Sequence, residues 1–385
     1  MTRKTGLEDY YVIRGSKKLR FGYTTGSCAA AASKAAVRML LTGREESEVE
    51  LMTPKGILLT LQLEEISLTA EQAICAVRKD SGDDPDTTNG ILVFATVQKT
   101  DRPGIYVDGG TGVGRVTLPG LKQPVGEAAI NPVPRAMILR EAEQCASELD
   151  YDGGLSIVIS VPEGEEIARR TFNPRLGIVG GISILGTSGI VEPMSEKALV
   201  DSIQVEMKQH FAQGEEYMLV TPGNYGENYL RNHMDLPFEK NIKCSNYVGE
   251  TIDMAIDMGV KGILFVAHIG KFVKVAAGIM NTHSHSADGR LEILAANSIR
   301  AGGSLSCARR ILDAMTTDEA LTILKEEGVL AATMEIIMDK IQFYLDHRSY
   351  EQILLGAVVF SDVHGYLGRT RDADRLIKAI SGKGE

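Results

Sequence analysis

Two patterns of apolar residues divide the chain into halves of different character. In the first half, runs rich in Val, Ile, Leu and Thr predict strands at 48–63, 91–99 and 155–162. Residues 24–43 predict a helix, because hydroxyl residues that can cap its start precede an alanine-rich interior and a final glycine. Residues 136–149 predict another helix, and a helix or turn is expected between the first two strand runs. This half therefore predicts a mixed α+β domain.

The second half alternates between short apolar strands and helical periodicity. Strands are predicted at 217–223, at 259–268 and within 354–368, and helices at 317–328 and 331–346. Strands that alternate with helices are typical of a parallel sheet built from βαβ units. The second half therefore predicts a Rossmann-like α/β layer.

Length and composition fit two folded domains. At roughly 150 residues per domain, a chain of 385 residues suggests two. We expect an α/β protein with a mixed α+β domain at 1–177 and a Rossmann-like α/β domain at 178–385. Hydrophobic residues make up 44% and charged residues 24%, which excludes wholesale disorder.

Charge and hydropathy exclude several classes of function. The net charge of −10 argues against general nucleic-acid binding, which needs a basic face. The longest uncharged apolar stretch, 176–191, has 16 residues, short of the ~20 that a membrane-spanning helix needs. The basic N-terminus has no apolar segment behind it and does not resemble a secretory signal. We therefore expect a cytoplasmic protein without a membrane span. Its five scattered cysteines form no C-x-x-C and are expected to be structural thiols.

The start of the first predicted helix is a candidate anion site. The sequence GYTTGSC places the hydroxyls of Thr24, Thr25 and Ser27 beside the free N–H groups of a helix N-terminus, which bind carboxylate or phosphate well. An ordinary capped helix would have the same sequence features.

Arginines supply a second candidate anion site. Arg135 ends a proline-rich segment, and Arg169, Arg170 and Arg175 lie around TFNP. Arginine pairs bidentately with carboxylates, so this group could clamp an anion, although a solvated charged face is the alternative. The nearby GGTGVG lacks a complete G-x-G-x-x-G and is more typical of a hairpin or bulge than of a nucleotide loop.

A glycine loop after a predicted strand is the candidate cofactor site. The sequence TPGNYGENYL follows the strand and opens a predicted helix, the usual arrangement for an adenosine-bearing cofactor at the carboxyl edge of a sheet. Thr221, Gly223, Asn224, Tyr225 and Gly226 are the candidate contacts. A plain turn is the alternative.

Residues 267–290 gather groups suited to proton transfer. Histidine titrates near neutral pH, so His283 and His285, with Asp288, are candidates for acid–base catalysis. The same H-S-H spacing with an aspartate could bind a metal, and ordinary surface histidines are a third possibility. The neighbouring histidine and cations are His268, Lys271, Lys274 and Arg290.

Together these stretches resemble the CbiD family, the cobalt-precorrin-5B carbon-1 methyltransferases of anaerobic cobalamin biosynthesis. The resemblance rests on FGYTTGSCAAAASKAA, GVGRVTLPGLKQPVGEAAINPVPR, RTFNPRLGIVGGISILGTSGIVEPMS, TPGNYGENYL, HIGKFVKVAAG and NTHSHSADGR, and covers about residues 20–300. It implies a two-domain α/β enzyme that transfers a methyl group from S-adenosylmethionine to ring carbon 1 of cobalt-precorrin-5B. The products would be cobalt-precorrin-6A and S-adenosylhomocysteine. The cobalt belongs to the substrate, and no metal bound by the enzyme is implied.

This resemblance assigns expected roles to the candidate residues. The glycine loop would bind the donor, and His283 or His285 would manage a proton or bind a peripheral carboxylate. A precorrin carries many carboxylates, so a chain of net charge −10 needs local cations to hold it. The candidate substrate-binding residues are Thr24, Thr25, Ser27, Arg135, Arg169, Arg175, Lys271, Lys274 and Arg290.

Two other classes compete with a methyltransferase. A small-molecule kinase could use GTGVG and the TTGSC helix to hold phosphates, but no P-loop G-x-x-x-x-G-K-[ST] is present. A non-enzymatic tetrapyrrole carrier would keep the arginines and need no adenosine loop. The sequence leaves the oligomeric state open, a homo-oligomer included.

Overall fold

The computed structural model describes residues 4–171, 173–174 and 176–382, and these form two compact units. The units are Met1–Glu196 and Lys197–Glu385, so the division falls after Glu196 and not after residue 177 as the sequence predicted. The reason is that the glycine-rich segment from 178 to 191 forms three short strands that pair with strands of the first unit. These strands are β13 (Ile178–Val179) with β11 (Arg115–Val116), β14 (Gly181–Ile182) with β10 (Gly112–Val113), and β15 (Ile190–Val191) with β3 (Gly22–Tyr23).

A five-stranded sheet forms the centre of the first unit. Its strand order is β6-β7-β8-β12-β9, antiparallel except for the parallel pair β12–β9. The strands are β6 (Glu64–Leu68), β7 (Gln72–Arg78), β8 (Leu92–Thr100), β9 (Ile105–Gly109) and β12 (Gly154–Ser160). Of the helix or turn expected before β8, only the helix is contradicted, because the segment forms the β6–β7 hairpin, and alternate residues of β7 are buried against the core.

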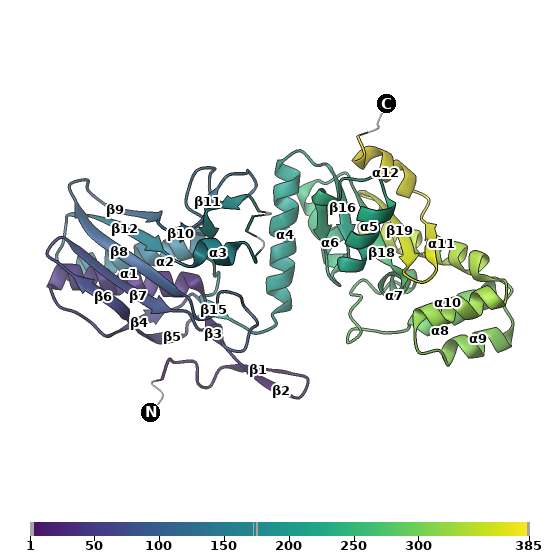
Figure 1. Cartoon of the computed structure of the whole chain (residues 1–385), viewed down its shortest axis with the longest axis horizontal. Coiled ribbons are helices and arrows are strands. Elements are labelled where there is room, and N and C mark those ends of the chain that lie inside the picture. Colours follow the sequence, from purple (N-terminus) through teal and green to yellow (C-terminus); the bar gives the residue numbers. More distant parts are fainter. Residues whose placement is uncertain (1–3, 172, 175, 383–385) are drawn as a thin grey trace. The chain divides into compact units, whose positions relative to one another are not determined.

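Two helices cover this sheet, and the first is almost wholly buried. Helix α1 (Thr25–Thr42) begins after its N-cap Thr24 and ends at Gly43, whose φ is 67°, as predicted. Its alanines lie at 0% exposure because a methyl side chain lets the helix approach β7, β8 and α2 (Pro132–Glu148) closely. Figure 1 shows α1 and α2 lying side by side along the sheet. The remaining elements of this unit are β1 (Tyr11–Arg14), β2 (Lys17–Arg20), β4 (Glu48–Met52), β5 (Leu58–Gln62), α3 (Gly164–Ala168) and the start of α4 (Glu196–Ala212).

The second unit contains the predicted parallel sheet. Its strand order is β17-β16-β18-β19-β20, and only the edge strand β20 is antiparallel. The strands are β16 (Tyr217–Thr221), β17 (Asn241–Lys243), β18 (Gly262–His268), β19 (Leu354–Ser361) and β20 (Gly365–Arg369). The chain as a whole is therefore the expected α/β protein, with an α+β first unit and a Rossmann-like second unit.

Helices cover both faces of the second sheet. One face packs its apolar side chains, such as Leu264 and Val358, against α5 (Asn224–His233) and α12 (Ala373–Ile380). The other face packs against a larger cluster that includes α6 (Val248–Met258) and α11 (Leu330–Ser349). The other helices of this unit are α4 from Lys197 onward, α7 (Ile269–Phe272), η2 (Val273–Ala277), α8 (Arg290–Arg300), α9 (Leu305–Leu312) and α10 (Thr317–Glu326), with η1 (Phe238–Lys240) before β17.

The strand order places a topological switch point in the second sheet. From β16 the chain crosses to β17 on one side, and from β17 it returns to β18 on the other side of β16. In open parallel sheets, ligands bind outside the carboxyl ends of the two strands where the order reverses. The fold therefore points to the ends of β16 and β18.

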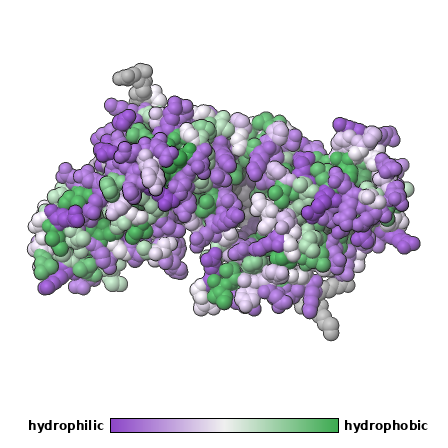
Figure 2. All heavy atoms as spheres, turned by 180° about the vertical axis from the view of Figure 1, so that it is seen from behind, coloured by the Kyte–Doolittle hydropathy of each residue, from purple (hydrophilic) through white to green (hydrophobic). Residues whose placement is uncertain are grey.

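None of the described helices combines the length and the apolar composition that a membrane span requires. On the face shown in Figure 2, hydrophobic residues lie scattered among hydrophilic ones.

Candidate functional site

The β16–α5 loop, residues 221–226, lies at the switch point. Gly223 is the N-cap of α5 and has a φ of 156° and a ψ of −170°, a conformation essentially restricted to glycine. A Cβ at Gly223 would meet only the Lys271 ammonium, 3.9 Å away, so the backbone there is open to a ligand. Gly223 has no side chain to cap α5, which leaves the first N–H groups of the helix facing the loop.

Gly226 has a different role from Gly223. A Cβ at Gly226 would lie 2.5 Å from the carbonyl oxygen of Val266, so glycine is needed for α5 to pack on β18. In dinucleotide-binding loops the third glycine has this role: it allows the helix to pack closely on the strand and does not contact the ligand.

The side chains of the loop divide into inward and outward groups. Thr221, a predicted cofactor contact, is 0% exposed, and its hydroxyl accepts a hydrogen bond from Asn241 Nδ2 at 3.0 Å. Tyr225 is 62% exposed and offers an open aromatic ring. The Asn224 Oδ1 accepts from Lys243 Nζ at 3.0 Å, which leaves its amide N–H groups for a ligand.

Sequence reasoning missed an ion pair beside this loop. Lys243 ends β17 and pairs with Glu227 on the first turn of α5, with Nζ and Oε2 2.5 Å apart. Lys243 stands 20 residues after Gly223, the interval at which a carboxylate follows the glycine loop in dinucleotide-binding folds. That spacing was the signal that could have led to it.

The β18–α7 turn faces the loop from the other side of the switch point. The Lys271 Nζ donates to the carbonyl oxygen of Pro222 at 2.9 Å, and burial lowers the pKa of Lys271. The His268 ring lies 5.5 Å from the Tyr225 ring, between centroids. The structure thus brings Lys271, predicted as a substrate contact, to the candidate cofactor loop.

The histidine loop, residues 281–290, is anchored beyond the end of β17. The Thr282 N–H donates to the carbonyl oxygen of Asn246 at 2.9 Å, and Asn281 forms a bridge with Tyr247. His283 and His285 are exposed, and their ring centroids are 5.0 Å apart. Both histidines therefore lie on the carboxyl side of the same sheet as the β16–α5 loop.

Three charged residues near these histidines have structural partners. Lys274 is 2% exposed, and its ammonium donates to the carbonyl oxygens of Thr282 and Ala287 at 3.1 and 2.8 Å. Lys274, predicted as a substrate contact, thus supports the loop from inside.

Asp288 and Arg290 form a two-point ion pair, with N–O distances of 2.6 and 2.9 Å. The hydrogen bond from Arg290 holds the pKa of Asp288, the predicted acid–base residue, below its usual value. The Arg290 guanidinium is already engaged by this carboxylate, which weakens the prediction that it binds substrate.

The α1 start, predicted as an anion site, forms hydrogen bonds within its own unit. The Gly26 N–H donates to the carbonyl oxygen of Leu185 at 2.8 Å, and the Ser27 hydroxyl donates to that of Gly189 at 2.7 Å. The Thr25 hydroxyl accepts from the Leu185 N–H at 2.9 Å, and the Thr24 hydroxyl accepts from the Ser27 N–H at 3.2 Å. These hydroxyls cap the helix and hold the glycine-rich segment.

The predicted arginine clamp is not assembled in the described residues. The Arg135 guanidinium donates to the carbonyl oxygen of Val107 at 2.8 Å and supports the sheet. Arg169 is on the surface, 75% exposed, and lies 3.8 Å from Glu165. The prediction for Arg175 lies outside the described residues.

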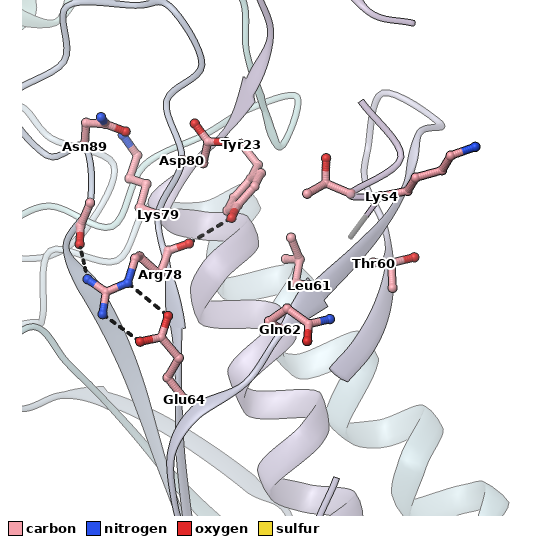
Figure 3. Close-up of a pocket in the computed structure, with 12 residues that line it drawn as sticks. Lys4, Tyr23, Thr60, Leu61, Gln62, Glu64, Arg78, Lys79, Asp80 and Asn89 are labelled. Carbon is pink, nitrogen blue, oxygen red and sulfur yellow. Dashed lines mark hydrogen bonds and ion pairs between the residues drawn. The ribbon is translucent and has the colours of Figure 1, made fainter. Parts of the chain in front are cut away.

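A cavity of about 410 Å³ in the first unit contains none of the predicted site residues. Figure 3 shows Arg78 turned toward Glu64, to which it is bound at 2.6 Å, and Lys4 pointing away. Tyr23 donates to the carbonyl oxygen of Arg78 at 2.8 Å. The cavity is therefore lined by an internal network.

The five cysteines are buried, free thiols, as predicted. Burial raises the pKa of Cys28 and Cys244 to about 12, so neither is a reactive thiolate at neutral pH. No three His, Cys, Asp or Glu residues in the described ranges are grouped to hold a metal ion.

These features define a class: a two-unit α/β protein with a candidate nucleotide-type ligand site at the switch point of its second sheet. A family model described as CbiD matches residues 12–193, and one described as CbiD, C-terminal domain, matches 281–371. The chain belongs to the CbiD family.

Relatives and one solved structure are similar to the chain over most of its length. It is 51% identical over 354 residues to a cobalt-precorrin-5B C(1)-methyltransferase of Ruminiclostridium cellulolyticum, covering 92% of each chain. It is 45% identical over 374 residues to the protein of that name from Alkaliphilus metalliredigens, covering 97% of this chain and 98% of the relative. A crystal structure of the cobalamin biosynthesis protein cbiD from Archaeoglobus fulgidus is 29% identical, covers 84% of this chain and 89% of that one, and has a TM-score of 0.39.

Proposed function

We propose that the chain methylates ring carbon 1 of cobalt-precorrin-5B with S-adenosylmethionine as the methyl donor, in the cytoplasm. The products are cobalt-precorrin-6A and S-adenosylhomocysteine. The observation that carries this proposal is the 51% identity, over 92% of both chains, with a protein named for this reaction. The cobalt enters and leaves with the corrinoid.

The β16–α5 loop is the proposed donor site. Three features of the loop fit an adenosyl ligand: the open backbone at Gly223, the exposed ring of Tyr225 and the uncapped start of α5. Gly223 lets the backbone approach the ligand, Tyr225 can stack on adenine, and Asn224 can donate from its amide. Thr221 and Gly226 support the loop from inside.

When bound, S-adenosylmethionine supplies a methyl group on a positively charged sulfur. Methyl transfer is an in-line displacement, so the main contribution of the protein is to hold the donor and ring carbon 1 at near-attack distance and exclude water. The carbon–methyl bond forms as the sulfur–methyl bond breaks, and that electron pair stays on sulfur. No bound metal is needed for this step.

The histidine loop is the proposed place for proton handling or for contact with the corrinoid's carboxylates. His283 and His285 are exposed and not ion-paired in the described structure, so both rings are accessible to a substrate. Arg169, with its exposed guanidinium, is the arginine proposed for a peripheral carboxylate.

Mass spectrometry of the corrinoid after incubation tests this function. Cobalt-precorrin-5B with S-adenosylmethionine should gain one methyl group only when the protein is present. A corrinoid that binds but gains no mass, together with no binding of S-adenosylmethionine, would overturn the proposal and favour a carrier. The kinase alternative would instead require ATP binding at the α1 start, which is closed by Leu185 and Gly189.

A further inference from the structure

His268 ends β18 at the switch point, where the β16–α5 loop begins on the neighbouring strand. Its ring centroid lies 5.5 Å from that of Tyr225 and 5.6 Å from that of Phe360. Phe360 lies near the end of the next strand and stacks on Tyr229 of α5 at 4.0 Å. The imidazole is thus held at the base of an aromatic cluster whose outermost ring, Tyr225, is open.

One nitrogen of His268 is already used by the protein. The Gly270 N–H donates to His268 Nδ1 at 3.1 Å, and this bond caps the short helix α7. A neutral imidazole has one N–H, so the acceptor role of Nδ1 places the proton on Nε2. Nε2 has no hydrogen-bond partner among the described residues, and the side chain is partly exposed.

The same hydrogen bond argues against a base at this position. To accept a proton, Nε2 would need a lone pair, and the ring proton would then sit on Nδ1. That proton would point at the Gly270 N–H and the cap of α7 would be lost. The geometry therefore makes His268 a hydrogen-bond donor through Nε2.

We propose that His268 is a further ligand-binding residue, which donates its Nε2–H to an oxygen of the adenosyl donor held against Tyr225. This inference rests on the proposed function and adds a residue to the same donor site. The oxygen that accepts this hydrogen bond is anionic or a hydroxyl. S-adenosylmethionine has two such groups, the methionyl carboxylate and the ribose hydroxyls. Lys271, three residues along the same turn, supplies a cation beside this position and favours the carboxylate.

Two amide substitutions separate the two nitrogens of the ring. In His268→Asn the amide oxygen can replace Nδ1 as the cap of α7, but nothing replaces Nε2–H. In His268→Gln the amide reaches the position of Nε2 and can donate, but the cap is lost. His347→Asn is the matched control, because His347 lies on α11, which leads to the amino ends of the strands.

Calorimetric titration of the full chain with S-adenosylhomocysteine measures the effect. We expect about tenfold weaker binding for His268→Asn with an unchanged melting temperature, binding within about threefold of wild type for His268→Gln, and no change for His347→Asn. A 5′-methylthioadenosine titration identifies the oxygen. If the carboxylate is the acceptor, His268→Asn binds 5′-methylthioadenosine as tightly as the wild type does. If the ribose is the acceptor, His268→Asn weakens the binding of 5′-methylthioadenosine as much as that of S-adenosylhomocysteine.

Nitrogen NMR of histidine-labelled protein gives an independent readout. The resonances that vanish in His268→Gln belong to His268, and they should report the Nε2–H tautomer with an Nε2 shift that moves on saturation with S-adenosylhomocysteine. Wild-type affinity in His268→Asn, an Nδ1–H tautomer, or an Nε2 signal that does not move would each overturn the inference. If the wild-type protein binds no S-adenosylhomocysteine at all, the proposed donor site itself fails, and that result is distinct from a failure of His268.

Discussion

Lys79 and Asp86 form an ion pair in which the lysine side chain is 2% exposed. The same ammonium donates to the hydroxyls of Ser81 and Thr88, each at 2.7 Å. Burial alone would raise the pKa of Asp86, but the charge and hydrogen bond of Lys79 outweigh it and hold the pKa below its usual value. This pair ties the acidic segment 80–90 to the end of β7.

Asp86→Asn should destabilise the first unit strongly. The substitution leaves the Lys79 ammonium buried without its counter-ion, which costs about 3–5 kcal/mol. Urea unfolding at pH 7 measures the loss, and Asp101→Asn, at an exposed position of the same unit, is the control.

The same pair has a pH signature. A carboxyl whose folded pKa is lowered stabilises the fold above its unfolded pKa of about 3.9, and this contribution is lost as pH falls through the folded value. The wild type should therefore lose more stability below pH ~4 than Asp86→Asn does. If the stability of the two proteins falls equally as the pH is lowered, Asp86 is not stabilised by Lys79.

Local signals explain how far the sequence predicted the fold. The bounds of α1 follow from Thr24 and Gly43, which act on their own turn of backbone, and the β16–α5 turn follows from a strand pattern next to glycines. The domain boundary failed because the strands from 178 to 191 find partners near residues 22 and 112–116, and no local pattern encodes that pairing.

Sequence reasoning about the candidate site misses hydrogen-bond partners that lie far away along the chain. The α1 start has the composition of an anion site, yet Leu185 and Gly189 occupy it from about 160 residues away. The sequence presents Lys274 as an available cation, because its carbonyl partners and its burial are properties of the folded loop. Sequence shows which charges exist, and the structure shows which are already paired.

Gly223→Ala should weaken donor binding. Any side chain there must adopt a φ of 156° and a ψ of −170°, at a cost of about 1–3 kcal/mol, or move the loop. Gly214→Ala is the matched control in the same unit, because Gly214 has a φ of 89° and a methyl group there would have no neighbouring atom within 4 Å. S-adenosylhomocysteine titration should show a loss for Gly223→Ala alone, and equal affinities for both variants would remove the loop from the donor site.

Tyr225→Ala should reduce donor affinity more than Tyr225→Phe does. Stacking of a base on an aromatic ring contributes about 1–3 kcal/mol, or roughly 5- to 150-fold in affinity, and Phe retains the ring. Phe343→Ala is the control, because Phe343 is 60% exposed on α11 of the same unit. Unchanged affinity for Tyr225→Ala would mean that the adenine is held elsewhere.

Lys271→Met should separate ligand binding from stability. The ammonium braces the Pro222 carbonyl oxygen at 2.9 Å, so its removal should weaken S-adenosylhomocysteine binding several-fold. Burial lowers the pKa of Lys271, which means that the folded protein binds this proton less tightly than the unfolded chain.

Stability should therefore rise with pH between the folded pKa of Lys271 and its unfolded value of about 10.4, because the unfolded state binds more protons in that window. Lys271→Met has no proton to lose at this position. Its stability should therefore rise less than that of the wild type at alkaline pH, while its stability at pH 7 is retained. Unfolding by urea at pH 7 and at about pH 10 tests both statements. A Lys271→Met protein that melts earlier at pH 7 and keeps full affinity would show that the ammonium only holds the fold.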